Sequence, residues 1–183
     1  MRSFMRRAFS GMLGLVAVAA MATLVAAAPA GAATRSTTAH PTWSTALRWP
    51  VVRRGDVGER VVAIQYLLQN KGFGVRADGV YGRATTAAVR SFQRSRHLNP
   101  SGIVGASTWN RLIVTLRLGS RGSAVRAVQH NLKFAYGFRF MRVTGFYGHE
   151  TWLAVMAFQR GSHLPVSGIV GHRTWKTIVV FER

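Results

Sequence analysis

The chain has 183 residues, 48% of them hydrophobic, which suits one ordinary domain or two small ones and is too apolar for a disordered chain. Cysteine is absent, which excludes disulfides, thiolate metal sites and cysteine nucleophiles. With 25 Lys and Arg against 5 Asp and Glu, the formal net charge is +20, which favours anionic partners, although a genome rich in arginine codons would explain the same excess.

Residues 1–33 are predicted to be a cleaved secretory signal peptide. Three arginines and no acid stand within residues 1–7, an uninterrupted apolar run covers residues 11–28, and small residues suited to cleavage follow. The alternative is an uncleaved membrane anchor, but eighteen helical residues reach about 27 Å, against a bilayer core of about 30 Å. We therefore expect a secreted protein that touches a membrane only if its signal is retained.

Residues 34–50 are predicted to be a linker. They are rich in Ser, Thr and Ala and show no apolar periodicity. Trp49 and Pro50, at the end of this stretch, are expected to fold back onto the domain that follows.

The rest of the chain is an internal repeat. It matches itself at a shift of 64 residues and, beyond a two-residue insertion, at a shift of 66. The longest identical stretch is Ser101-Gly102-Ile103-Val104-Gly105, which recurs as Ser167-Gly168-Ile169-Val170-Gly171. Two tandem domains follow from this, predicted at residues 51–114 and 117–181.

Each repeat is predicted to hold three helices, because apolar residues recur at spacings of three and four along one face. The predicted inward faces of the first repeat are formed by Val57, Val61, Ile64 and Leu68; by Thr85, Ala88, Val89 and Phe92; and by Trp109, Leu112 and Ile113. Those of the second repeat are formed by Val125, Val128 and Leu132; by Thr151, Val155 and Phe158; and by Trp175 and Ile178. The fold class is therefore all-α, with two small three-helix bundles in tandem.

The turns between these helices give three further expectations. Ser107 is a candidate N-cap of the third helix. Residues 103–104 are expected to pair with residues 80–81 as a short ribbon. Glycines recur before each helix, at Gly79, Gly82, Gly102 and Gly105 and their equivalents, and are expected to adopt positive φ.

Four ordered motifs occur in both copies. In the first copy they read Gly55-Asp56-Val57-Gly58, then Asp78-Gly79-Val80-Tyr81-Gly82-Arg83-Ala84-Thr85, then Ala88-Val89-Arg90-Ser91-Phe92-Gln93, and finally Ser101-Gly102-Ile103-Val104-Gly105-Ala106-Ser107-Thr108-Trp109. Each repeat thereby resembles the three-helix peptidoglycan-binding domain found at the ends of many wall hydrolases and in the propeptides of matrix metalloproteases. The resemblance implies a three-helix bundle that binds peptidoglycan.

The copies depart from the family pattern at its Asp-Gly turns. Asp is kept only at Asp78, and Ser101, Thr144 and Ser167 stand at the equivalent positions. Ser and Thr can serve as well as Asp in a turn. A ligand contact made by Asp would be lost in the second repeat, so we expect the first repeat to bind more strongly.

Candidate ligand-binding residues are aromatic, amide and guanidinium side chains. Each has a structural alternative: the tryptophans fall at inward helical positions, the tyrosines stand beside Gly at a helix start, and the arginines suit a solvated face. Arginines could pair with stem-peptide carboxylates, and glutamines could bond a glycan or peptide. The candidates are Tyr81, Arg83, Arg90, Gln93 and Trp109 in the first repeat and Tyr147, Gln159 and Trp175 in the second.

No constellation of catalytic residues is expected. Glycan cleavage needs two carboxylates across one bond, and the acids are Asp56, Glu59, Asp78, Glu150 and Glu182. Most of them stand where an acid favours a helix start or a turn. The histidines lack the spacing of a zinc site, so neither a metal nor a cofactor is expected.

Together these features predict a secreted, non-catalytic protein of the cell wall. Its expected partner is peptidoglycan or the anionic polymers associated with it. Nucleic acid is not expected, because the chain carries an export pattern and its arginines form no stripe. The alternatives are a secreted wall hydrolase, an accessory or inhibitory subunit of one, or a basic protein held by anionic wall polymers.

Overall fold

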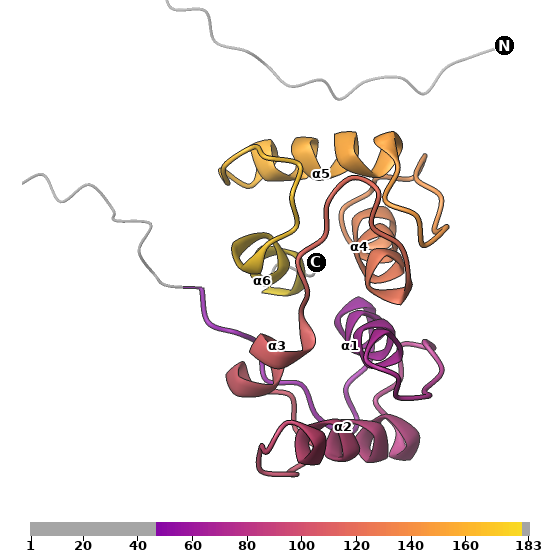
Figure 1. Cartoon of the computed structure of the whole chain (residues 1–183), viewed down its shortest axis with the longest axis vertical. Helices are drawn as coiled ribbons and strands as arrows, with labels where there is room; N and C mark the ends of the chain where they lie inside the picture. Colours follow the sequence, from indigo (N-terminus) through magenta and orange to yellow (C-terminus); the bar gives the residue numbers. More distant parts are fainter. Residues whose placement is uncertain (1–46, 181–183) are drawn as a thin grey trace, which may run out of the picture. The chain divides into compact units, whose positions relative to one another are not determined.

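The computed structural model describes residues 47–180, so the predicted signal peptide and most of the predicted linker lie outside the described residues. Within that part the chain forms two successive sets of three α-helices (Figure 1). The helices are α1 (Glu59–Asn70), α2 (Arg83–Ser95), α3 (Ala106–Leu112), α4 (Ser123–Phe134), α5 (His149–Gly161) and α6 (His172–Val180). The predicted all-α fold with two tandem three-helix units is confirmed.

The apolar faces predicted from the sequence form the core, except for Val57 and for Ile113, which lies just beyond the end of α3 and is only partly buried against the core. Val61, Ile64 and Leu68 of α1 are fully buried, as are Val125, Val128 and Leu132 of α4. Val57 is 69% exposed, because α1 begins only at Glu59 and Val57 instead forms an isolated β-bridge with Val80. The four-residue step from Val57 to Val61 therefore crosses a helix boundary.

Short antiparallel bridges tie the segment before each bundle to the loop before its last helix. Val104 pairs with Val52, and Leu116 pairs with Val170. The predicted ribbon between residues 103–104 and 80–81 is wrong, because Val52 occupies the edge that Val80 would need. The sequence did not reveal this pairing because its partners lie about fifty residues apart.

Two buried indoles fasten the same segments. Trp109 Nε1 donates to Pro50 O at 2.8 Å, and Trp175 Nε1 donates to Val114 O at 2.6 Å. Trp49 stacks on Trp109 with ring centroids 5.4 Å apart, so Trp49 and Pro50 do fold back onto the first bundle. Through this hydrogen bond and the β-bridge, residues 113–116 make the same contacts with the second bundle that residues 49–52 make with the first.

The starts of the helices differ from expectation. Gly105 is the N-cap of α3, and Ser107 lies inside that helix, so the predicted Ser107 cap is wrong. Gly79 and Gly102 adopt positive φ, of 74° and 75°, as expected. Gly82 and Gly105 do not, with φ of −86° and −104°, because they extend the chain into the helix instead of turning it.

A buried glutamine joins each long helix to the loop and helix that follow. Gln65 accepts from Gly79 N–H at 2.9 Å, and its amide donates to Val80 O and Thr85 Oγ1. We call this arrangement the glutamine clamp, and it recurs at Gln65, Gln93, Gln129 and Gln159. Each clamp satisfies backbone groups that burial would otherwise leave unpaired, so one helix fixes where the next begins.

The two bundles pack on each other through α1 and α4, and α2 and α5 lie on the outer sides of that pair (Figure 1). His130 Nδ1 on α4 lies 2.6 Å from a carboxylate oxygen of Glu59 on α1. Arg60 Nε donates to Val179 O at 2.6 Å, near the C-terminal end of α6, where a cation is favoured. These contacts make the tandem one packed unit.

Candidate functional site

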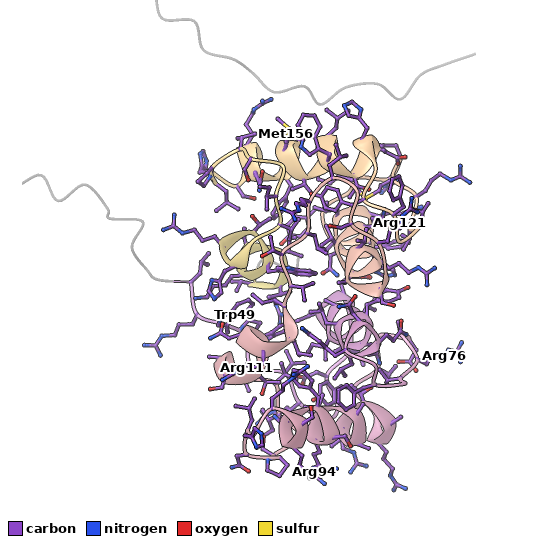
Figure 2. The ribbon with its side chains drawn as sticks, in the orientation of Figure 1. Trp49, Arg76, Arg94, Arg111, Arg121 and Met156 are labelled. Atoms are coloured by element: carbon purple, nitrogen blue, oxygen red, sulfur yellow. The ribbon has the colours of Figure 1, made fainter. Side chains whose placement is uncertain are left out.

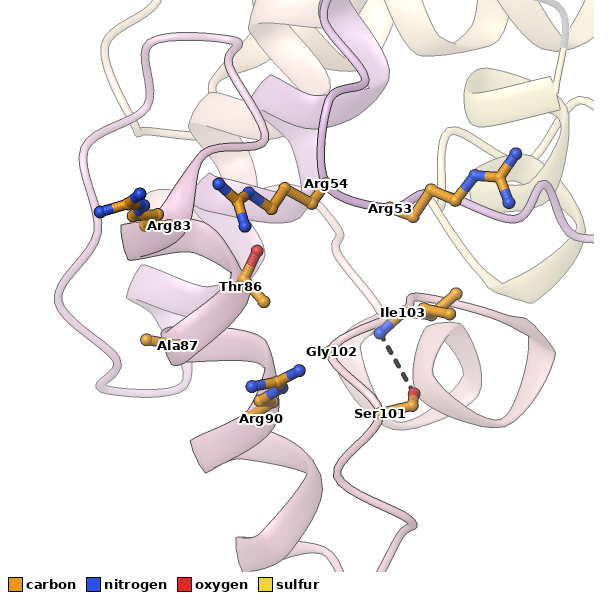
Figure 3. A pocket seen from close by; sticks show the side chains of 9 residues that line it. All are labelled: Arg53, Arg54, Arg83, Thr86, Ala87, Arg90, Ser101, Gly102 and Ile103. Carbon is orange, nitrogen blue, oxygen red and sulfur yellow. Dashed lines mark hydrogen bonds between the residues drawn. The ribbon is translucent and has the colours of Figure 1, made fainter.

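A hollow of about 420 Å³ opens beside the first turns of α2 (Figure 3). Arginine dominates its lining, so we call it the arginine hollow. Its lining residues are Arg53, Arg54, Arg83, Thr86, Ala87, Arg90, Ser101, Gly102 and Ile103.

One face of α2 forms the wall of the arginine hollow. Arg83, Thr86, Ala87 and Arg90 fall at helical steps of three and four, so they lie along the same side of the helix. Arg54 reaches toward this wall from the segment before α1, whereas Arg53 points away (Figure 3). Three guanidinium groups, from two separate segments, thus border one hollow.

The floor is the loop of Ser101, Gly102 and Ile103. Gly102 has a φ of 75°, and a Cβ there would lie 2.9 Å from Thr86 Cγ2 and 3.0 Å from Arg90 Nε. Only glycine allows the loop to approach α2 this closely. Ser101 Oγ accepts from Ile103 N–H at 3.2 Å.

The arginine hollow is uniformly cationic. No carboxylate lines it, and among residues 47–180 no salt bridge or side-chain hydrogen bond engages Arg54, Arg83 or Arg90. Other exposed arginines, such as Arg76 and Arg94, project from different parts of the surface (Figure 2). The arrangement can bind an anion but has no group that would serve as a general acid or base near neutral pH.

The second repeat does not reproduce the arginine hollow. Leu118, His149 and Met156 stand where the first repeat has Arg54, Arg83 and Arg90, and Trp152 replaces Thr86. The Trp152 indole lies so close to Gly168 that a Cβ there would overlap it. His149 stacks on Trp152 with ring centroids 5.4 Å apart. The equivalent space is therefore partly filled by an aromatic side chain.

Of the eight ligand-binding candidates predicted from the sequence, the structure brings Arg83 and Arg90 together at the arginine hollow. The four aromatic candidates are fully buried: Tyr81, Trp109, Tyr147 and Trp175. The hydroxyls of Tyr81 and Tyr147 donate to Gly102 O and Gly168 O, each at 2.8 Å. Burial raises the pKa of Tyr81 well above its ordinary value, with a smaller effect from Asp56.

The two glutamine candidates, Gln93 and Gln159, are members of the glutamine clamp. Gln93 is 2% exposed, and Gln159 is 1% exposed. Gln93 Nε2 donates to Ile103 O at 2.8 Å and to Thr108 Oγ1 at 3.0 Å. In this structure their polar atoms are occupied by their own chain, as are those of the aromatic candidates.

Sequence reasoning missed Arg54 and Ser101 as residues of the site. A signal for Arg54 was present, because the repeat alignment places Leu118 opposite it, while Gly55 and Gly58 just after it are kept in the second repeat. A position that changes between repeats while its surroundings stay fixed points to a surface role. Ser101 gave no such signal, because Ser167 is its equivalent.

The described acids are engaged in local contacts, and none of them lines the arginine hollow. Asp56 accepts from Arg53 N–H at 2.9 Å, and Asp78 accepts from Val80 N–H and from the Gln65 amide. These hydrogen bonds, of which the one from Val80 N–H has the largest effect, hold the pKa of Asp78 below its ordinary value. Within the described part of the chain, no three His, Asp or Glu residues gather as a metal would require.

The profile of the family described as "Putative peptidoglycan binding domain" matches residues 57–112 and 121–178. The chain belongs to this family. Both matches lie inside the two bundles, which are therefore peptidoglycan-binding domains in tandem. No helix between residues 47 and 180 is both long and apolar enough to cross a membrane.

The relatives match over about one repeat. An uncharacterized protein in the bpoA1 3' region of Kitasatospora aureofaciens is 42% identical over 65 residues, which are 34% of this chain and 55% of that protein. The spore cortex-lytic enzyme of Bacillus subtilis is 45% identical over 65 residues, 34% of this chain and 21% of the enzyme. The chain thus spans about half of one relative and a fifth of the other.

Two solved structures are similar over a comparable stretch. A peptidoglycan-binding protein from Clostridioides difficile, in complex with glutamine hydroxamate, shares 40% identity over 34% of this chain and 40% of its own, with a TM-score of 0.34. The SleB N-terminal domain shares 38% identity over 37% of this chain and 93% of its own, with a TM-score of 0.35.

Proposed function

We propose that this protein is a secreted, non-catalytic component of the bacterial cell wall that binds peptidoglycan. The family assignment of both bundles supports peptidoglycan as the partner. The export pattern at residues 1–33, which lies outside the described residues, supports secretion.

The observation that carries the proposal is the arginine hollow. Peptidoglycan presents free carboxylates on its stem peptides, and guanidinium groups bind carboxylates through paired N–H donors. Arg54, Arg83 and Arg90 border the hollow without an internal counter-charge. A peptidoglycan-binding domain with such a surface is suited to holding the wall.

The absence of catalysis is supported by the small number of acids. The sequence holds five Asp and Glu in total. Besides Asp56 and Asp78, Glu59 faces His130 and Glu150 accepts from Arg142 N–H. Among residues 47–180, a pair of carboxylates placed across a glycosidic bond, as glycan hydrolysis requires, would have to come from these engaged groups, and Glu182 lies outside the described residues. The similarity to the spore cortex-lytic enzyme extends over 65 residues, about one repeat, and covers 21% of that enzyme.

Incubation of the secreted protein with purified sacculi tests both halves of the proposal. We expect the protein to sediment with the sacculi and to release no soluble muropeptides, while a muramidase run in parallel releases them. Failure to sediment would refute wall binding, and release of glycan or peptide fragments by the clean protein would refute the non-catalytic role.

Removal of the anionic wall polymers, combined with a salt series, separates binding to peptidoglycan from attraction to those polymers. Ions at 1 M shorten the range of electrostatic interaction to about 3 Å. If anionic wall polymers hold the protein, 1 M salt or removal of those polymers should abolish sedimentation. We expect sedimentation to weaken in salt and to survive removal of the polymers.

A further inference from the structure

The arginine hollow has unused hydrogen-bonding capacity, and the following inference rests on the proposed function. The guanidinium groups of Arg54, Arg83 and Arg90 offer several N–H donors each, and no acceptor among residues 47–180 takes them up. The Ser101 hydroxyl accepts from Ile103 N–H, which leaves its own O–H free to donate. Every one of these groups offers hydrogens, so the matching ligand is an acceptor with negative charge.

The form of the hollow favours a carboxylate carried on a peptide over an extended phosphate polymer. Its volume of about 420 Å³ is many times the ~30 Å³ that one water molecule occupies, so it admits the chain that bears the charged group. Ala87 and Ile103 add apolar surface beside the arginines. A phosphodiester chain would need cations spaced along a track, whereas these three arginines border a single hollow (Figure 3).

The second repeat provides the contrast within the same chain. At the positions of the three arginines it has Leu118, His149 and Met156, and Trp152 lies against Gly168 in the equivalent space. The backbone there is similar, because Gly168 and Tyr147 make the same hydrogen bond as Gly102 and Tyr81. Side chains alone distinguish the two surfaces.

We propose that the arginine hollow is the stem-peptide carboxylate site of this protein and that the second repeat has no equivalent. The tandem then holds one carboxylate-binding module and one module that contacts the wall differently. Carboxylates of the wall ligand accept hydrogen bonds from the guanidinium groups of Arg54, Arg83 and Arg90 and from the hydroxyl of Ser101.

A variant that gives the first repeat the residues of the second tests this proposal. Arg54→Leu, Arg83→His and Arg90→Met are combined in the secreted protein. The control combines Arg76→Leu, Arg94→His and Arg111→Met, which removes the same charges from exposed positions outside the hollow (Figure 2). Circular dichroism establishes that both variants are folded.

Binding is measured by calorimetric titration with soluble disaccharide–peptide muropeptides. We expect the hollow variant to lose at least tenfold in affinity and the control to lose less than threefold. Muropeptides with amidated carboxylates should bind the unaltered protein as weakly as the hollow variant binds the free acids. Equal affinity of the two variants, or no effect of amidation, would overturn the proposal.

A phosphate source is distinguished by a second titration with poly(glycerol phosphate). Binding of that polymer more tightly than muropeptides, with loss in the hollow variant, would assign the arginine hollow to phosphate and refute the carboxylate site. Sedimentation with sacculi keeps the outcomes separate. If the unaltered protein does not sediment, the proposed function fails, whereas if both variants sediment like the unaltered protein, only the present inference fails.

Discussion

Replacing Gln93 by Met distinguishes a structural glutamine from a ligand-binding one. Met has a similar length and no amide, so the change removes one member of the glutamine clamp while largely preserving volume. Three hydrogen bonds are lost, with Gly102 N–H, Ile103 O and Thr108 Oγ1. Because the site is buried, the groups left behind cannot turn to water.

The expected cost follows from these bonds. At about 1 kcal/mol for each, the free energy of unfolding should fall by about 3 kcal/mol. For a unit of this size, 1 kcal/mol corresponds to about 4 °C, so the Tm should fall by about 12 °C. Gln69→Met is the matched control, because Gln69 makes one bond, to Val75 O at 2.8 Å, and should lose about 4 °C.

Thermal unfolding followed by circular dichroism gives the Tm, and sedimentation with sacculi at low temperature gives binding. We expect any loss of binding by Gln93→Met to accompany the fall in Tm, because Gln93 holds Gly102 and Ile103 in the floor of the arginine hollow. A Tm close to that of the unaltered protein would refute the clamp. Loss of binding at unchanged Tm would show that Gln93 serves the ligand, as the sequence alone allowed.

Three further predictions concern stability. Gly168→Ala should lower the Tm more than Gly119→Ala, because both glycines have positive φ but only Gly168 lies against Trp152. Combining Gly168→Ala with Trp152→Ala should restore part of the lost Tm. Equal effects of the two glycine changes would contradict this packing. The pKa of Asp78 is lowered in the folded state, so its contribution to stability is complete above its ordinary pKa of 3.8 and is lost as the pH falls through the folded value. Asp78→Thr should therefore reduce the fall of the Tm in acid. An unchanged dependence of the Tm on pH would refute this. Because α1 and α4 pack together and Glu59 faces His130, calorimetry should show one unfolding transition, and two separated transitions would show that the bundles unfold independently.

Local patterns predicted the helices well. Six apolar faces followed from spacing alone, and the residues that failed stand at helix ends. Val57 continued the periodicity of α1 although the helix starts only at Glu59, and Ser107 had the chemistry of a cap but lies inside α3. Both errors arise because spacing does not reveal where the backbone leaves the helical conformation.

Long-range features were beyond the sequence patterns. The pairing of Val52 with Val104 and the packing of α1 on α4 depend on how distant segments fold back. The buried glutamines looked like ligand donors, because a pattern shows the amide but not the loop that already occupies it. Arg83 and Arg90 could be selected from one helix face, whereas Arg54 joins them only through the tertiary fold.

The glutamine clamp also determines where the chain can change in length. Each clamp forms hydrogen bonds with the turn immediately before the next helix, so residues further upstream do not determine where that helix begins. The second repeat has two extra residues in this upstream stretch, between α4 and Thr144, and Gln129 still bonds to Gly145 N–H at 2.9 Å. The corresponding stretch of the first repeat includes the exposed Gly74, where an added methyl group would meet no atom within 4 Å. A peptide tag or fluorophore-bearing insertion belongs there, where it would report on the attached protein without displacing the helices.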